Sequence, residues 1–207
     1  ARLMEGDLRD RDSIGSAVSE VKPDAVMHFA AYALVAESMS SPEKYFRNNL
    51  AGGINLAEAM IENNVSRIVF SSTCATYGQP DDVPITEEAD QRPTNPYGES
   101  KLCFERVLRW YRDLHNMHPV FLRYFNACGA THRFGEDHDP ESHLIPIVLQ
   151  AALGRRDSVT IYGDDYDTPD GTCLRDYIHI LDLAQAHILA LDTEQSGAFN
   201  LGNGKGY

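Results

Sequence analysis

Short apolar runs alternate along the chain with longer segments in which apolar residues recur every three or four positions. The short runs, rich in β-branched and aromatic residues, predict strands at residues 25–29, 68–71, 120–124, 159–162 and 198–201. The longer segments predict helices at residues 42–64, 96–115, 144–153 and 181–191. This order predicts an α/β fold with a doubly wound parallel sheet, right-handed crossovers and helices on both faces.

Ligands of doubly wound sheets bind outside the carboxyl ends of the strands. Three loops are expected to lie there, and each carries small or polar residues: 29–38, 71–78 and 125–130. A further segment, residues 163–174, is rich in Asp, Gly and Thr and is expected to be irregular. Loops of about this length are usually functional or disordered. These loops are therefore the first places to look for a site.

Composition narrows the possible partners. The 207 residues are 43% hydrophobic and 24% charged, as in a globular domain, and no apolar run approaches the roughly 18 residues that span a bilayer, so no membrane partner is expected. The formal net charge of −13 argues against nucleic acid as a partner, because phosphates need a clustered basic face. The four cysteines stand far apart and indicate free thiols in a reducing cytoplasm, and no secretion leader is seen.

One helix carries a pair of residues suited to proton transfer. Tyr97 and Lys101 stand four apart, so their side chains share a helix face, and a nearby ammonium would lower the phenol pKa toward that of a useful base. The same spacing arises by chance on many surface helices. Thr73 stands among hydroxyl residues at the end of a predicted strand, where it could bond the same reacting oxygen. Ser71 and Ser72 are expected instead to satisfy backbone groups of the loop.

Thr73, Tyr97 and Lys101, with their surroundings, resemble the catalytic triad of the extended short-chain dehydrogenase/reductase family. Within that family the chain is most similar to the 4-epimerase branch, whose members act on UDP-sugars. The resemblance runs along the chain through the stretches GDLRD, MHFAA, SSTCATYG, PYGESK, RYFNACGA, GEDHDPESHLIP and YGDDYDTPDGTCLRDYIH. It implies a Rossmann-like fold in which residues 1–125 are the remainder of an NAD-binding domain. Residues 126–207 would be mainly a substrate-binding region with returning sheet elements.

The resemblance also implies two sets of binding residues besides the catalytic triad. NAD would be bound by Asp7, Leu8, Phe29, Ala30, Ala31, Asn48, Thr73, Tyr97, Lys101 and Phe125. The UDP-sugar would be bound by Thr73, Tyr97, Asn126, His143, Leu144, Thr160, Tyr162 and Arg175. Arg175 also makes chemical sense, since a diphosphate in an acidic protein needs a guanidinium, although a salt bridge to a nearby aspartate is equally open. No metal is expected, because His28, His138 and His143 are scattered and no HExxH run occurs.

The function implied is NAD-dependent epimerisation at C4, which would interconvert UDP-glucose and UDP-galactose through a 4-keto intermediate. A UDP-linked N-acetylhexosamine or pentose is an alternative substrate. A 4,6-dehydratase or decarboxylase is disfavoured, because Cys74 and Ala75 stand where those enzymes need a carboxylate. A non-catalytic family member is a third possibility, since the family's glycine-rich phosphate loop is not among the 207 residues.

The resemblance further implies a homodimer formed by the predicted helices 42–64 and 96–115. Both helices carry apolar residues that could form the contact, and these could equally serve the core of a single chain. They are Leu50, Ile54, Leu56, Leu102, Phe104 and Leu108.

Overall fold

The computed structural model describes residues 2–139 and 141–207 and separates into two units. The first unit consists of the residues up to Tyr124 together with Ala186–Leu201. The second unit consists of Phe125–Gln185 and Gly202–Tyr207. The chain therefore leaves the first unit after Tyr124, returns to it within a helix, and leaves it again near its end.

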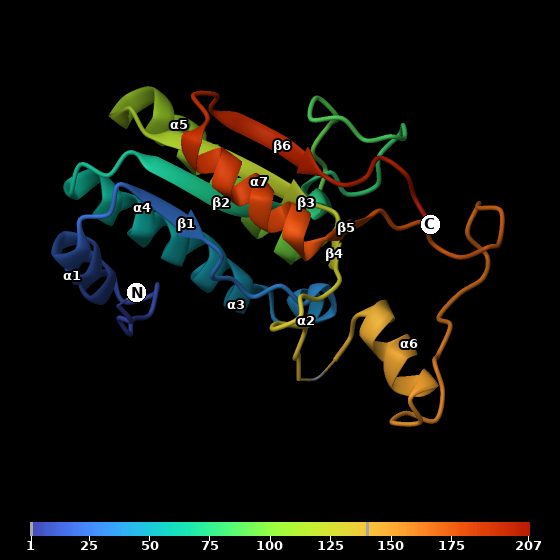
Figure 1. The fold of residues 1–207 in the computed structure, drawn as a ribbon. Coiled ribbons are helices and arrows are strands. Elements are labelled where there is room, and N and C mark those ends of the chain that lie inside the picture. Colours follow the sequence, from blue (N-terminus) through green and yellow to red (C-terminus); the bar gives the residue numbers. More distant parts are fainter. Residues whose placement is uncertain (1, 140) are drawn as a thin grey trace. The chain divides into compact units, whose positions relative to one another are not determined.

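Among the described residues, the first unit is built on four parallel strands in the order β1-β2-β3-β6 (Figure 1). Their bounds are Ala25–His28 for β1, Arg67–Thr73 for β2, His118–Tyr124 for β3 and Gly197–Leu201 for β6. Thr73 pairs with Tyr124, and Tyr124 with Leu201, so these strands end together at one edge. The predicted α/β fold with a parallel sheet is confirmed.

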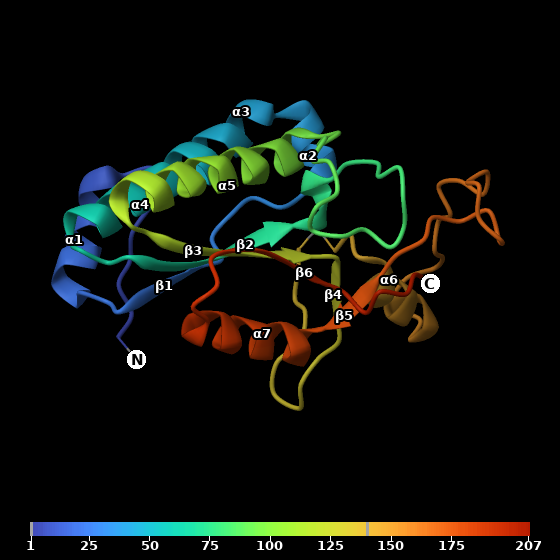
Figure 2. The same cartoon turned by 90° about the horizontal axis from the view of Figure 1, so that it is seen from above.

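Helices cover both faces of this sheet (Figure 2). On one face lie α4 (Gly52–Glu62) and α5 (Pro96–His115), with α1 (Arg11–Val21) beside α4. On the other lie residues 186–192 of α7 (Ile180–Asp192). The larger core includes Ile68, Phe70, Phe104, Leu108 and Phe121, and the smaller core, on the α7 face, includes Val69, Val120, Leu122 and Ala190. Adjacent residues of β2 and β3 are thus buried on opposite faces, which explains their unbroken apolar runs.

The helix expected at residues 42–64 forms as three consecutive pieces. They are α3 (Pro42–Tyr45), a π-helical turn (Phe46–Ala51) and α4. Gly53 allows α4 to approach α5 closely, since a Cβ atom there would lie 2.9 Å from the Phe104 ring. Two helices were not predicted: the polar α1, capped by the Asp10 side chain, and the short α2 (Val35–Ser40).

The second unit contains less regular structure. Strands β4 (Asn126–Cys128) and β5 (Tyr177–His179) form a parallel pair, and α6 spans Leu144–Ala152. The strand predicted at residues 159–162 is wrong, because residues 153–176 form neither helix nor strand. Its short apolar run is not covered by a core: Ile161 is 73% exposed and Tyr162 is 97% exposed. The irregular course expected for residues 163–174 is confirmed.

In the part of the chain that the structure describes, the helices are too short or too polar to cross a bilayer.

Candidate active site

The start of α5 is fixed by its own sequence. The Asn95 side chain accepts a hydrogen bond from the Gly98 amide at 2.8 Å, and Pro96 occupies the first helical position. This cap sets the positions of Tyr97 and Lys101, which lie on consecutive turns with the Lys101 Nζ atom 6.0 Å from the centre of the Tyr97 ring.

Gly98 brings this helix start against the turn that follows β2. A Cβ atom at Gly98 would lie 2.5 Å from the Ala75 carbonyl oxygen, so a larger residue would push the helix away from the turn. The close approach puts the Thr73 side chain beside the Tyr97 phenol. The structure therefore brings together all three members of the predicted triad.

Lys101 is held beneath the sheet edge by several groups. Its side chain is buried, its ammonium donates to the Ser71 carbonyl oxygen at 2.8 Å, and it lies 4.8 Å from the Phe70 ring centre. Burial lowers the pKa of Lys101 to about 7, although the charge of Glu105 acts in the opposite direction. Lys101 therefore changes its protonation near neutral pH.

Tyr97 behaves differently from the expectation that Lys101 would lower its pKa. Burial raises the pKa of the Tyr97 phenol, and the Thr73 side chain only partly opposes this effect. The reason is that moving a phenolate out of water costs more free energy than a hydrogen bond from one hydroxyl group recovers. A phenolate at Tyr97 therefore requires a compensating positive charge nearby.

His28 is the last residue of β1 and lies close to this group. Its ring stacks on Phe70 at 5.6 Å and meets the edge of Phe104 at 5.8 Å. Burial lowers the pKa of His28 to about 3, and the charge of Lys101 adds to the effect. His28 is therefore a neutral packing group at physiological pH.

The expectation that Ser71 and Ser72 satisfy loop backbone groups is wrong. Both lie within β2, where Ser71 Oγ forms a hydrogen bond of 2.6 Å with the Tyr124 hydroxyl and Ser72 Oγ donates to the Glu105 carboxylate. Thr73 does serve the backbone, because its Oγ1 accepts from the Ala75 amide at 3.1 Å. The hydroxyl proton of Thr73 remains available to a neighbouring oxygen.

The first residues predicted to contact NAD precede α1. The Asp7 carboxylate binds the Arg9 guanidinium, with 2.6 Å between Oδ2 and Nη2, and this hydrogen bond lowers the pKa of Asp7 to about 2. The Leu8 carbonyl oxygen accepts from the Asn55 side chain at 2.8 Å, which ties the segment to α4.

The predicted residues Phe29, Ala30 and Ala31 form the loop after β1. Phe29 and Ala30 are exposed, and the two alanines are small, so the backbone of this loop is open to a ligand. The loop is tied down by Asn49, which exchanges two hydrogen bonds of 2.9 Å with the Tyr32 backbone.

Asn49 is the buried neighbour of the predicted residue Asn48. The Asn48 side chain donates to Asn49 Oδ1 at 3.1 Å, and Asn49 in turn donates to Ser100 Oγ on α5 at 3.2 Å. The remaining predicted cofactor residue, Phe125, belongs to the second unit, where it lies next to Gly202.

The residues predicted to bind only the substrate all belong to the second unit. Asn126 is tied to β5, since both its amide and its side chain donate to the Asp176 carbonyl oxygen at 2.9 Å. Arg175 is exposed and donates to the Leu174 carbonyl oxygen at 2.8 Å, and the ion pairs among the described residues do not include it. Leu144 and Tyr162 are 55% and 97% exposed, and Thr160 is also exposed.

His143 has closer neighbours than its sequence position suggested. The Nδ1 atoms of His138 and His143 lie 2.7 and 2.8 Å from Glu136 Oε1, and His143 also contacts Glu141 at 2.9 Å. The expectation that these two histidines are scattered is therefore wrong. The ligand atoms of Glu136, His138 and His143 lie within 4.8 Å of one another on exposed side chains, and exposed acidic groups are common without a metal ion.

A buried charged network beneath the triad was not predicted from the sequence. Arg123 donates to both carboxylate oxygens of Glu105, at 3.0 and 2.7 Å, and Arg109 donates to the same carboxylate at 2.9 Å. Arg123 also donates to the Tyr77 hydroxyl at 2.7 Å. A possible signal was the arginine within the apolar run of β3. The network connects α5 to β3 through Arg123 and to β2 through Ser72, the neighbour of Thr73.

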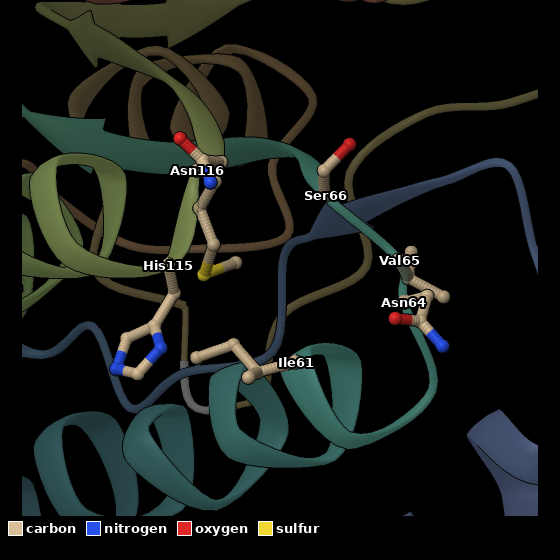
Figure 3. Close-up of a pocket in the computed structure, with 7 residues that line it drawn as sticks. Ile61, Asn64, Val65, Ser66, His115 and Asn116 are labelled. Atoms are coloured by element: carbon tan, nitrogen blue, oxygen red, sulfur yellow. The ribbon is translucent and has the colours of Figure 1, made fainter.

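A shallow hollow of about 180 Å³ lies at the amino ends of β2 and β3 (Figure 3). It is lined by Ile61, Asn64, Val65, Ser66, His115, Asn116 and Met117. Because Thr73 ends β2 at the opposite end of the strand, this hollow is not part of the candidate site.

Comparison with known proteins identifies relatives along the whole chain. The model of the NAD dependent epimerase/dehydratase family matches residues 1–202. The UDP-glucose 4-epimerase of Halalkalibacterium halodurans is 53% identical over 99% of this chain and 63% of its own length. That of Streptococcus mutans is 54% identical over 100% of this chain and 64% of its own length.

Solved structures agree with these matches. The UDP-glucose 4-epimerase from Brucella ovis in complex with NAD has a TM-score of 0.93 and 49% identity, covering 98% of this chain and 64% of that one. The enzyme from Bifidobacterium longum in complex with NAD+ and UDP has a TM-score of 0.91 and 43% identity, covering 98% and 63%. The chain thus spans a little under two thirds of the relatives it matches.

Proposed function

Since this chain belongs to the NAD-dependent epimerase/dehydratase family, we propose that the whole protein inverts C4 of a UDP-sugar, with UDP-glucose and UDP-galactose as the interconverted pair. The observation that carries the proposal is the joint position of Thr73, Tyr97 and Lys101 at the carboxyl edge of a parallel sheet. A sugar hydroxyl bound there would meet a phenol and a threonine hydroxyl at once. We propose NAD as the cofactor.

In this proposal Tyr97 removes the proton of the sugar 4-hydroxyl while Thr73 donates a hydrogen bond to the same oxygen. Burial raises the pKa of Tyr97 and lowers the pKa of Lys101 to about 7. A single charge on either buried side chain costs free energy, but a phenolate on Tyr97 and an ammonium on Lys101 stabilise each other when both are present. Lys101 therefore supports the base by carrying the compensating charge.

NAD, when bound, supplies the hydride acceptor for C4 and the hydride donor for the return step. The open loop of Phe29, Ala30 and Ala31 fits a cofactor that approaches backbone amides, because small side chains at the end of β1 leave that backbone uncovered. We propose that Asp7 and Leu8 contact the adenine. Asn48, Lys101 and Phe125 would contact the rest of the cofactor.

Loss of the C4 hydrogen leaves a ketone without a defined configuration at that carbon. Inversion then requires the ketone to present its other face before the hydride returns, while the nucleotide stays bound. We propose that Arg175 binds the diphosphate, and its exposed guanidinium without an acidic partner among the described residues supports this role. The other proposed nucleotide-sugar contacts are Asn126, His143, Leu144, Thr160 and Tyr162.

The experiment that tests this function is incubation of the whole protein with UDP-galactose, UDP-N-acetylgalactosamine and UDP-arabinose, followed by chromatography of the products. We expect UDP-glucose from the first substrate without an added oxidant or reductant. If only UDP-N-acetylgalactosamine or only UDP-arabinose is converted, that sugar nucleotide replaces UDP-galactose as the proposed substrate. If none is converted, the protein is a non-catalytic family member.

We also propose that the whole protein is a homodimer whose contact includes α5. Among the apolar residues that suggested this, Leu56, Leu102, Phe104 and Leu108 are buried in the core of their own unit, and Leu50 and Ile54 pack against it. The outward face of α5 instead presents Trp110, 65% exposed, and Leu114, 67% exposed, one turn apart. This pair is suited to an apolar contact between two copies.

We expect light scattering to give a dimer mass for the unmodified protein and a monomer mass when Trp110 and Leu114 are both changed to arginine, because four charges would then face one another across the contact. The matched control is Val83→Arg, since Val83 is 77% exposed on a loop away from α5 and should leave the dimer intact. A monomer mass for the unmodified protein would remove the proposal.

We propose a cytoplasmic location. It is supported by the cysteines, since the described residues form no disulfide at Cys74, Cys103, Cys128 or Cys173, as expected in a reducing compartment.

A further inference from the structure

A chain of three side chains lies on the α7 face of the sheet, behind the candidate site. The Tyr124 hydroxyl at the end of β3 lies 2.6 Å from Ser71 Oγ and 2.8 Å from the Nε2 atom of His187 on α7. Ser71 and His187 are buried, and Tyr124 is partly buried. We call Ser71, Tyr124 and His187 the bridge.

The bridge ends at two parts of the candidate site. At one end, the Ser71 carbonyl oxygen accepts the hydrogen bond of the Lys101 ammonium at 2.8 Å. At the other end, the His187 ring lies 4.8 Å from the ring of Phe29, in the loop proposed to receive the cofactor. The bridge therefore joins the backbone that holds the lysine to the loop after β1.

The Tyr124 hydroxyl is the central group of the bridge. Burial raises the pKa of Tyr124 to about 12, so its hydroxyl keeps its proton at neutral pH and remains a donor. It has one proton, which it can donate to Ser71 Oγ or to Nε2 of His187. The other partner then donates to the phenol oxygen, either from the Ser71 hydroxyl or from an Nε2–H of the imidazole.

We propose that Tyr124 and His187 are positioning residues, which fix the Ser71 peptide and through it the Lys101 ammonium. This inference rests on the proposed function, in which Lys101 stabilises the phenolate of Tyr97. Neither residue needs to touch the substrate. Without the bridge, Ser71 loses its side-chain partner and its carbonyl can shift, and displacements of about 1 Å in a catalytic group can cost about a hundredfold in rate.

The test measures kcat, KM and the melting temperature of the whole protein with UDP-galactose. Tyr124→Phe keeps the ring and deletes the hydroxyl, and we expect kcat to fall about 10- to 100-fold with KM changed less than about twofold. His187→Leu should have the same effect. His187→Gln should restore most of the rate, because its amide group can donate to the Tyr124 hydroxyl or accept from it in place of Nε2.

The double variant Tyr124→Phe with His187→Leu should be no slower than either single variant, since both remove one bridge. The inference is overturned if Tyr124→Phe keeps the unmodified kcat, or if kcat falls only as far as the folded fraction measured by circular dichroism. It is also overturned if His187→Gln is as slow as His187→Leu. An inactive unmodified protein would overturn the proposed function itself, and the inference with it.

Discussion

Replacing Tyr97 by phenylalanine is expected to lower kcat of the whole protein by about 10²–10⁴-fold, the usual contribution of a positioned general base. This corresponds to about 3–5 kcal/mol of transition-state stabilisation. The hydroxyl is the only group lost, so Thr73 and Lys101 keep their places and KM for the UDP-sugar should change little. The measurement is steady-state kinetics of UDP-glucose formation.

The matched control for this prediction is Tyr111→Phe. Tyr111 lies on the same helix, is partly exposed, and sits away from the triad near Glu58. The same loss of a hydroxyl there should leave kcat within about twofold, since it removes no group from the site. A Tyr97→Phe variant that keeps more than a tenth of the unmodified rate would show that another group is the base.

The second large effect concerns the buried network around Glu105. Glu105 is 0% exposed and Arg123 is 1% exposed, so Glu105→Leu leaves a guanidinium charge in the core without its carboxylate. We expect a loss of about 3–5 kcal/mol in the free energy of unfolding, measured by urea denaturation. Glu105→Leu with Arg123→Leu should recover much of this loss, because both buried charges are then removed.

Glu99→Leu is the control on the same helix. The Glu99 carboxylate is partly exposed and meets Arg106 at 4.0 Å, and exposed pairs of this kind contribute about 0–1 kcal/mol. The free energy of unfolding of Glu99→Leu should therefore lie within about 1 kcal/mol of the value for the unmodified protein. If Glu99→Leu and Glu105→Leu lowered the free energy of unfolding equally, burial would not be what makes the network costly to break.

The strands could be predicted where burial leaves a pattern in the sequence itself. β2 and β3 are covered on both faces and therefore form continuous apolar runs. β4 and β5 have three residues each, which is too short for a period to emerge. The false strand at residues 159–162 shows the converse, since a local run of apolar and β-branched residues cannot supply a partner strand or a core.

The candidate site also contains residues that the sequence predicts and residues that it does not. Tyr97 and Lys101 could be found because a helix places residues four apart on one face, and Thr73 because it ends a strand. The contacts of Arg123 with Glu105 and of His187 with Tyr124 could not be predicted. The partners lie 18 and 63 residues apart in the sequence and meet only in the folded protein. The close approach that needs glycine at Gly98 is likewise set by the Ala75 carbonyl, and no local pattern signals it.

In the proposed mechanism a hydride leaves C4 of the sugar and returns to the same carbon. The most direct test gives the whole protein UDP-galactose that carries deuterium at C4 of the sugar and follows the product by mass spectrometry and NMR. We expect UDP-glucose that retains the deuterium at C4, because the hydride does not exchange with water while it is held in the site. Loss of the deuterium to solvent, or a product with the C4 configuration unchanged, would contradict the proposed mechanism.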